Sequence, residues 1–492
     1  MLIAVSAGFL IYRSRQQTPA QEYDVTVVPP TCTENGYSLY TGREDGGVHV
    51  QDVVPALGHS FGPWVTVDSV DPLQPSGRSR TCNTCSAEEG EWVYPRLAIP
   101  TVALEGEQKG IGKTAEVSIT ARIYGLGEDL ISHATLKYQG HESMVFPKKN
   151  YTLKLWKDPD QSEKNKVTIG SWAPENKYIL KASYTDPSVC RNLICADIWS
   201  DITASRAEIP EQFQSLANYG AVDGFPVALY MNGTFQGLYN MNLHKDDDLF
   251  GMSDGEDHAI LIANNGNQPE AYFRGCSAFT DTSSWEVEYC GTEDAAWAQQ
   301  KLNDLITFVM ESDDAAFRAE LGQHLDVNSA IDYLLGIYAL GLWDHGASDL
   351  MLVCYSRDEP LTACMYDMET AFGLSADGLT ALSAEQFLPY MENGRWVSDT
   401  GSLLWDRMME NFYPELCSRY RQLRQQILTS ENLCSHVTTF TAAIDPELYT
   451  QNDTLYPGLP AAEDSVEQIL TYIQTRIPLL DEIFLKNEGF ES

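Results

Sequence analysis

The amino-acid sequence predicts an α+β fold with two lobes, a strand-rich lobe over residues 96–265 and a helical lobe over 266–490, preceded by a small β-rich module over 23–95. Three changes along the chain indicate this class. The module is rich in Thr, Gly, Pro and Ser, the next segment alternates apolar and polar residues, and after about residue 290 apolar residues recur three and four apart. Strands followed by helices are typical of α+β proteins, and two lobes would meet at a cleft, the usual place for a ligand.

The first 22 residues contain a short apolar run at positions 2–12, which is followed by Arg13 and Arg15. As a helix this run would reach ~16 Å, against the ~30 Å of a bilayer core. It resembles the apolar part of a signal peptide or the distal end of a membrane anchor. We therefore expect an extracytoplasmic protein, at the cell surface or held by a single N-terminal membrane anchor. The alternative is a buried N-terminal strand or helix.

The composition excludes several classes of protein. Hydrophobic residues make up 43% and charged residues 21% of the chain, which excludes wholesale disorder and a polytopic membrane protein. The chain has 32 Lys and Arg against 70 Asp and Glu, a formal net charge of −38. Because no basic field is available to hold a phosphodiester backbone, nucleic acid is not an expected partner. The same charge favours divalent cations and basic protein partners.

The module carries three cysteines whose spacing differs from that of the other cysteines. Cys82 and Cys85 have the two-residue separation of half a zinc knuckle, and Cys32 and His59 could complete four ligands for zinc. A disulfide from Cys32 to Cys82 or Cys85 is the alternative in an oxidising compartment. The segment is similar to a small module, often repeated, of surface proteins of Gram-positive bacteria, which normally carries two cysteine pairs. That resemblance implies a spacer or surface-interaction domain, with Gly42 at the position where another cysteine is expected.

Apolar residues recur with two different spacings along the chain, and each spacing predicts one of the two lobes. The segment 226–243 is typical of two strands joined by Asn232 and Gly233, because both turn positions need positive φ. Alternation predicts further strands over 114–125, 150–156 and 177–184. The helical period predicts helices over 190–202, 295–310, 327–340 and 465–484.

Four acidic residues lie in two loops of the helical half. The helix at 327–340 is followed by an acidic loop at 343–349, two short strands at 349–355 and 362–366, and a second acidic loop at 367–373. A hairpin returns the chain to its starting edge, so we expect its two acidic loops to lie close together. The loops supply Asp344, Asp349, Asp367 and Glu369.

Converging carboxylates suit a hard divalent cation such as Mg²⁺ or Mn²⁺, which takes oxygen ligands. Unrelated solvated loops are the alternative in so acidic a chain. Trp343 and Phe372 argue against that alternative, since solvated loops need no bulky apolar neighbours.

An anionic ligand held against these carboxylates would need cations. The strand-rich lobe offers four candidates for binding it, which are Lys149, Lys154, Lys181 and Arg191. Alternation along a strand fixes which side chains share a face, but not which face meets the cleft. For each single lysine the alternative is a solvated residue that discourages edge-to-edge aggregation.

Hydrolase and P-loop chemistries are poorly supported, because no G-x-S-x-G, H-E-x-x-H or phosphate-binding GK[ST] loop is present. Phosphoryl transfer fits better. Asp344, Asp349, the hairpin, Asp367 and the pair Phe372-Gly373 follow the order of the catalytic and metal-binding elements of protein kinases. The His-Arg-Asp, compact Asp-Phe-Gly and glycine-rich signatures of eukaryotic kinases are missing.

Five strings over residues 97–490 resemble the CotH family of spore-coat-type atypical kinases. They are QGHESMVFPKKNYTLKL at 139–155, KYILKASYTDPSVCRNLICADIW at 177–199, GFPVALYMNGTFQGLYNMNLHKDDDLFGM at 224–252, WDHGASD at 343–349 and YDMETAFG at 366–373. The resemblance implies a two-lobed, atypical kinase-like fold. It also implies a secreted or surface protein that uses ATP with Mg²⁺ or Mn²⁺ to phosphorylate Ser or Thr of protein substrates.

Residue by residue, the resemblance gives Asp344 the position of the catalytic base and Asp367 that of the metal ligand, with Glu369 as a neighbouring acid. Asp349 stands where the family usually has an Asn that binds a second metal. Gln139 replaces an Arg, and Leu361 lies near the position of an adenine-packing aromatic residue. These departures keep a second reading open, in which the domain is a catalytically impaired pseudokinase or a surface scaffold.

Overall fold

The computed structural model describes residues 22–44, 46–140, 142–216, 218–264, 266, 268–275, 279 and 284–486. The chain forms two compact units, the first made of residues up to Val67 together with Gly77–Glu91, and the second of Asp68–Ser76 and the chain from Trp92 onward. The expected signal or anchor segment falls, apart from Glu22, outside the described residues. In the part of the chain that is described, no helix combines the length and the apolar character needed to cross a membrane.

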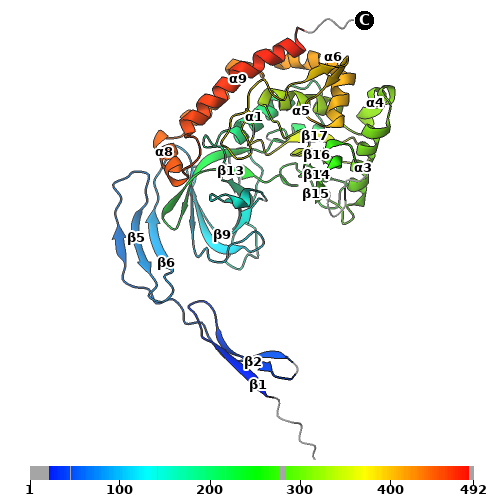
Figure 1. Cartoon of the computed structure of the whole chain (residues 1–492). Coiled ribbons are helices and arrows are strands. Elements are labelled where there is room, and N and C mark those ends of the chain that lie inside the picture. The colour runs from blue at the N-terminus through cyan, green and yellow to red at the C-terminus, as the bar shows by residue number, and fades with distance from the viewer. Residues whose placement is uncertain are drawn as a thin grey trace, which may run out of the picture. The chain divides into compact units, whose positions relative to one another are not determined.

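The first unit consists of two small antiparallel sheets, drawn in blue in Figure 1. Their orders are β1-β2-β3 and β4-β5-β6, and the strand predicted at 23–28 is present as β1. The strand bounds are β1 Tyr23–Val28, β2 Gly36–Gly42, β3 Val48–Val54, β4 Val65–Val67, β5 Ser76–Thr81 and β6 Glu88–Val93. Among the described residues of this unit, the only buried hydrophobic side chains are Cys32 and Cys82. The unit therefore has almost no apolar core.

The second unit begins with seven strands that close into a ring in the order β10-β11-β13-β12-β7-β8-β9. Their bounds are β7 Thr101–Glu105, β8 Val117–Tyr124, β9 Leu130–Gln139, β10 Asn150–Trp156, β11 Lys177–Lys181, β12 Gly224–Met231 and β13 Thr234–Leu243. The predicted hairpin is present, and its turn residues Asn232 and Gly233 have φ of 48° and 80°. Alternate side chains of these strands point inward to form one apolar cluster, which includes Leu136, Leu153 and Leu180.

A second sheet has the order β15-β14-β16-β17. It comprises β14 Ala259–Ala263, β15 Trp285–Cys290, β16 Leu350–Cys354 and β17 Thr362–Met365, and a separate pair comprises β18 Tyr390–Glu392 and β19 Arg395–Val397. The predicted acidic-loop hairpin is present as β16 and β17. The segment just before residue 265, which the sequence groups with the strand-rich lobe, forms β14 and pairs with this hairpin. All five of its side chains are buried. Ala259, Leu261 and Ala263 pack in the cluster that contains the helices, whereas Ile260 and Ile262 pack in a separate cluster on the other face of the sheet.

Nine helices are present within the described residues, and the helices predicted at 190–202, 295–310, 327–340 and 465–484 are among them. Their bounds are α1 Arg191–Ala204, α2 Glu211–Gln214, α3 Ala296–Glu311, α4 Asp314–Glu320, α5 Val327–Leu340, α6 Leu403–Leu423, α7 Ser430–Ala442, α8 Pro446–Leu455 and α9 Ala462–Phe484. Three 3₁₀ turns are η1 Glu142–Val145, η2 Pro269–Tyr272 and η3 Leu321–Gln323. The predicted α+β class is confirmed.

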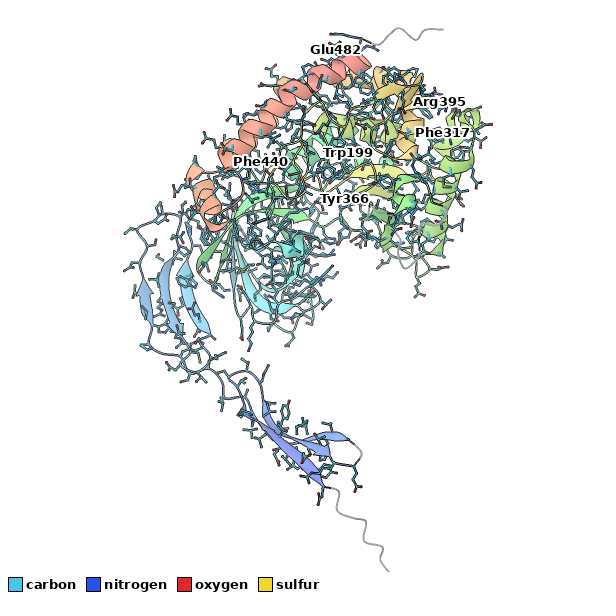
Figure 2. The ribbon with its side chains drawn as sticks, viewed as in Figure 1. Trp199, Phe317, Tyr366, Arg395, Phe440 and Glu482 are labelled. Atoms are coloured by element: carbon cyan, nitrogen blue, oxygen red, sulfur yellow. The ribbon has the colours of Figure 1, made fainter. Side chains whose placement is uncertain are left out.

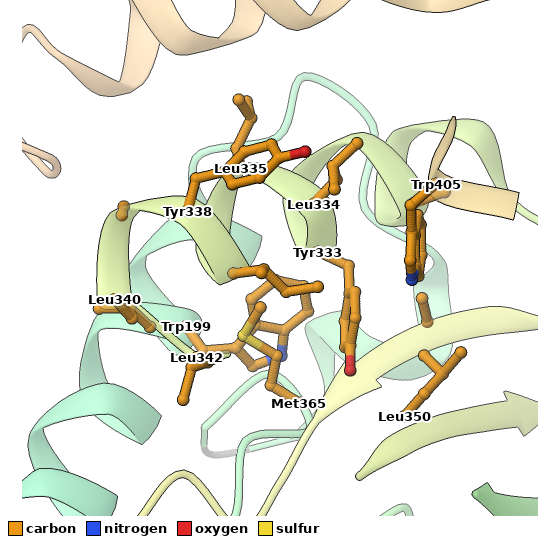
Figure 3. Close-up of a cluster of buried hydrophobic side chains, with 14 of the residues drawn as sticks. Trp199, Tyr333, Leu334, Leu335, Tyr338, Leu340, Leu342, Leu350, Met365 and Trp405 are labelled. Atoms are coloured by element: carbon orange, nitrogen blue, oxygen red, sulfur yellow. The ribbon is translucent and has the colours of Figure 1, made fainter. Parts of the chain in front are cut away.

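Helix α5 lies at the centre of the largest apolar cluster, and twelve of its fourteen residues are buried. Figure 3 shows its side chains enclosed by Trp199, Met365 and Trp405 from other elements. Tyr333 stacks on Trp405 with ring centroids 5.2 Å apart. Because α5 is held on all sides, the loop at its C-terminal end starts from a fixed point.

Candidate functional site

The first acidic loop begins where α5 ends. Gly341 adopts φ of 65° and closes the helix in the left-handed conformation that favours glycine. Trp343 donates its indole N–H to the carbonyl of Leu374 at 2.8 Å, which ties the first loop to the end of the second. The carbonyl of Asp344 accepts from the amide of Ser348 at 3.0 Å. The loop is therefore a tight turn that holds the Asp344 side chain beside the second loop.

The hairpin register brings the two loops together, as the sequence predicts. Leu350 of β16 pairs with Met365 of β17, so Asp349 and Asp367 flank the same end of the hairpin. Both have positive φ, of 57° and 54°, a conformation that Asp tolerates better than most residues. The amide of Asp349 donates to the carbonyl of Ala263 at 2.8 Å, which ties this end to β14. Figure 2 labels Tyr366, the buried residue between the hairpin and Asp367.

Lys181, on β11 of the closed sheet, faces these carboxylates. Its ammonium pairs with Asp367 and lies 3.7 Å from an oxygen of Glu369, which also accepts from the hydroxyl of Ser183 at 3.1 Å. Burial alone would lower the pKa of Lys181, but Asp367 and Glu369 outweigh it and raise that pKa. Lys181 conversely holds the pKa of Asp367 below its ordinary value against the effect of burial. In this ion pair Lys181 balances the charge of Asp367, while 42% of the Asp367 side chain stays exposed.

Asp344 is oriented by two neighbours that bond the same carboxylate oxygen. His345 Nδ1 lies 2.8 Å from this Oδ1, and the hydroxyl of Thr370 donates to it at 2.8 Å. His345 Nε2 lies 3.0 Å from the carbonyl of Tyr366. Since a carboxylate and a carbonyl only accept, both ring nitrogens of His345 donate and the ring is an imidazolium. Burial opposes this charge, but Asp344 raises the pKa of His345 to about 8.

The pKa of Asp349 is shifted in the opposite direction from that of Asp367. Burial, and then the charge of Asp367, raise the pKa of Asp349 well above its ordinary value. The raised pKa favours the protonated form of Asp349. One ligand atom each of Asp344, His345 and Asp349 lie within 4.8 Å of one another. Because both nitrogens of His345 are engaged, the oxygens of Asp344, Asp349 and Asp367 are the donors left for a hard cation.

The other three predicted cations do not contact these carboxylates. Lys149 donates to the carbonyls of Met144 and Phe146 in its own loop, and Lys154 pairs with Glu116 at 2.8 Å. Arg191 is fully buried. Alternation could not separate Lys154 from Lys181, because the register of β10 and β11 decides which face meets the site.

Arg191 instead positions the second acidic loop. Its guanidinium pairs with Asp186 and donates to Ser465 at 2.9 Å and to Gln468 at 2.6 Å, both on α9. Its Nε donates to the carbonyl of Ala371 at 3.0 Å. Arg191 therefore connects α1, α9 and the loop at 367–373, and its charge is already balanced by Asp186.

Sequence reasoning overlooked Lys148, the neighbour of Lys149. Its ammonium is buried, bonds the carbonyl of Leu238 and lies 3.1 Å from the side-chain oxygen of Asn452. Burial lowers the pKa of Lys148 to about 7. It lines a small pocket together with Ser183 and Asp453, next to Glu369. The only signal in the sequence was the Lys-Lys pair, which does not tell which lysine turns inward.

A protein-family model described as CotH kinase protein matches residues 136–480. The matched region starts in β9 and ends in α9, so it includes both acidic loops, Lys181 and Arg191. No curated protein sequence matches the chain.

Proposed function

The chain belongs to the CotH kinase family, whose model covers well over half of it, and from this premise we propose that it is an atypical protein kinase. The proposed reaction moves the γ-phosphoryl group of ATP to a Ser or Thr hydroxyl of a protein, with Mg²⁺ or Mn²⁺. The observation that supports it most directly is the convergence of Asp344, Asp349, Asp367 and Glu369 with Lys181 at one end of the β16–β17 hairpin.

Asp344 is the proposed base. His345 and Thr370 both bond its Oδ1 and fix the plane of the carboxylate, while Oδ2 accepts no hydrogen bond from the described residues. An oriented carboxylate with one oxygen available can accept the proton of an attacking hydroxyl. The imidazolium of His345 keeps Asp344 ionised, because an adjacent positive charge favours the carboxylate form.

The residues present fit a divalent cation. Asp367 and Asp349 would hold the metal with Glu369 beside them, and Asp367 is exposed enough to receive an ion from solvent. A bound cation supplies charge neutralisation for the phosphate oxygens. Lys181 balances Asp367 before a cation enters, and its ammonium would then be released toward a phosphate.

We further propose basic protein substrates and an extracytoplasmic location at the cell surface. The net charge of −38 supports the first, since such a field attracts cationic partners. The apolar run at positions 2–12 supports the second, as the apolar part of a signal peptide or membrane anchor.

Transfer from radiolabelled ATP tests the proposal, with the chain itself and a panel of basic, serine-containing proteins as acceptors. We expect transfer with Mg²⁺ or Mn²⁺ and none with chelator. Asp344→Asn should lower the rate on the order of 10² to 10⁴-fold while metal-dependent ATP binding persists. The matched control is Asp358→Asn in the exposed turn of the same hairpin, which should transfer normally. Full transfer by Asp344→Asn, or ATP binding that ignores the metal, would contradict the proposal.

One observation favours the pseudokinase or scaffold reading as a second candidate. Gln139, at the position of an Arg in the family string, has a buried side-chain oxygen without a hydrogen-bond partner among the described residues. An uncharged side chain thus stands where the family string has a cation, and its buried oxygen is left unpaired in the described part of the chain. Metal-dependent ATP binding with no transfer to any acceptor would select this reading.

A further inference from the structure

Four side chains of the first unit that can bind a metal lie together. They are Cys32, His59, Cys82 and Cys85, and one ligand atom from each lies within 4.8 Å of all the others. The sulfurs of Cys32 and Cys82 are 3.8 Å apart, and the sulfur of Cys85 is 3.2 Å from His59 Nδ1. The four come from three separate segments, which are the β1–β2 loop, the segment after β3 and the β5–β6 turn.

Backbone hydrogen bonds hold these three segments in place. The amide of Gly58 donates to the carbonyl of Cys32 at 3.0 Å, and the amide of Asn83 donates to the carbonyl of Ser60 at 2.9 Å. His59 is therefore fixed between the first cysteine and the Cys-x-x-Cys turn. In that turn, the amide of Thr84 points at the sulfur of Cys82 at 3.5 Å. An N–H aimed at a sulfur stabilises the thiolate form that a metal requires.

The separations match a tetrahedral zinc site. With Zn–S of about 2.3 Å and Zn–N of about 2.0 Å, the edges of the tetrahedron are about 3.8 Å between sulfurs and about 3.5 Å from sulfur to nitrogen. The observed distance of 3.8 Å between sulfurs equals the first edge, and the observed 3.2 Å from sulfur to nitrogen is slightly shorter than the second. A disulfide would use two of the three cysteines and leave the third beside a histidine with no role. The histidine supplies the fourth ligand that Gly42 cannot supply.

The first unit also needs such a link for its stability. Cys32 and Cys82 are its only buried hydrophobic residues in the described part, whereas Val25, Val27, Val48 and Val50 are exposed. Domains this small with so little apolar burial depend on disulfides or metals. This shortage of core is independent of the ligand geometry and indicates the same site.

We propose that Cys32, His59, Cys82 and Cys85 bind one structural zinc ion. The site is closed, with four protein ligands and no position left for a substrate. It is separate from the proposed kinase chemistry, so either proposal can fail without the other.

The test measures metal content in the full chain, purified under reducing conditions and supplied with zinc. We expect one zinc per chain by elemental analysis and native mass spectrometry. Cys85→Ser and His59→Ala should each lose the zinc. Both side chains are exposed, so their loss leaves no cavity. Cys434→Ser on α7 and His49→Ala on β3 are matched controls and should keep the zinc, as should Asp367→Asn.

Cobalt gives a second readout that does not depend on stoichiometry. Replacement of zinc by Co²⁺ should produce the absorption of a tetrahedral, thiolate-bound ion in the wild-type chain and in the controls, and His59→Ala should change it. Three thiols should become reactive only after a strong chelator is added. A chain that holds no zinc, or a Cys32–Cys82 disulfide found in protein that was never exposed to oxidant, would overturn the proposal.

Discussion

Two clusters of metal-binding side chains lie in this chain, and the protein around them is built in opposite ways. The cysteine–histidine cluster of the first unit includes that unit's only buried hydrophobic residues among those described. The carboxylate cluster follows α5, a helix enclosed by the largest apolar cluster of the molecule (Figure 3). The comparison teaches that a metal would hold the fold together in the first unit, whereas the fold would hold the metal in the second.

The two clusters also differ in how their charge is balanced without a metal. In the second unit, Lys181 pairs with Asp367, and burial raises the pKa of Asp349. His345 donates to Asp344. In the first unit, the sulfurs and the imidazole contact one another, a backbone amide and the ring of Phe61, and the described residues place no charged side chain in an ion pair with them. Removal of a bound metal should therefore lower the stability of the first unit much more than that of the second.

The largest effect is expected from a zinc chelator. Structural zinc sites contribute on the order of 10 kcal/mol to the folding of small domains. We expect the chelator to open the first unit to proteases between residues 22 and 91, while residues 97–486 stay protected with an unchanged melting temperature. Limited proteolysis read by mass spectrometry measures both, and added zinc should restore protection. Equal resistance of the first unit with and without chelator would remove the contrast between the two regions.

The second prediction concerns pH and His345. Its folded-state pKa of about 8 lies above the unfolded value of 6.5, so the contribution of His345 to stability is fully present below pH ~6.5 and is lost as the pH rises through 8. The loss amounts to about 2 kcal/mol. Chemical unfolding of the second unit at several pH values should show it in the wild type and not in His345→Gln. If both proteins have the same pH profile, His345 is not an imidazolium.

Asp367 is the proposed ligand of the divalent cation, and its charge should contribute strongly to cation binding. Two unit charges at ~4 Å interact by about 4 kcal/mol at an effective dielectric of ~20, so even a largely screened loss should exceed a factor of ten. We expect Asp367→Asn to weaken Mn²⁺ binding at least about tenfold without unfolding the domain, since Lys181 keeps Glu369 as a partner. Electron paramagnetic resonance of free Mn²⁺ measures this, with Asp358→Asn as the control. Unchanged Mn²⁺ affinity would place the metal elsewhere.

The smallest effect is expected from Asp349→Asn. Because the raised pKa of Asp349 favours its protonated form, a cation that binds its carboxylate competes with a proton. The Mn²⁺ affinity of the wild type should rise with pH, by up to about tenfold per pH unit, and this rise should be weaker in the variant. At low pH the two should bind alike. Parallel pH profiles would show that Asp349 is not a ligand.

The sequence predicted the parts of the site that depend on local pattern. The hairpin turn signals and the two acidic loops were enough to place Asp349 near Asp367, and the structure has them at one end of β16 and β17. What could not be predicted depends on packing between distant segments. The pairing of β14 with β16, and the choice of Lys181 over Lys154, are decided by which sheet face meets the helices.

Arg191 and Lys148 are two charged residues whose burial the sequence could not predict. A charged residue at the start of a helix or strand is usually expected on the surface, yet Arg191 is buried because Asp186, some residues earlier, balances its charge. Lys148 is buried and makes no ion pair with any described residue, and its ammonium is held by Leu238 and Asn452. The partners of Lys148 are far from it in the chain, and the contact of Arg191 with Asp186 is made in a loop before the helix, so a periodic pattern indicates neither contact.

The left-handed backbone at Asp349 and Asp367 limits how this chain can change over evolution. Only Gly, Asn and Asp adopt that conformation routinely, and other residues strain it by about 1 to 3 kcal/mol. Gly carries no side-chain oxygen, so Asp and Asn are the two residues that suit both the backbone and a cation. The charge of the site can then change in steps of one unit without rebuilding its loops.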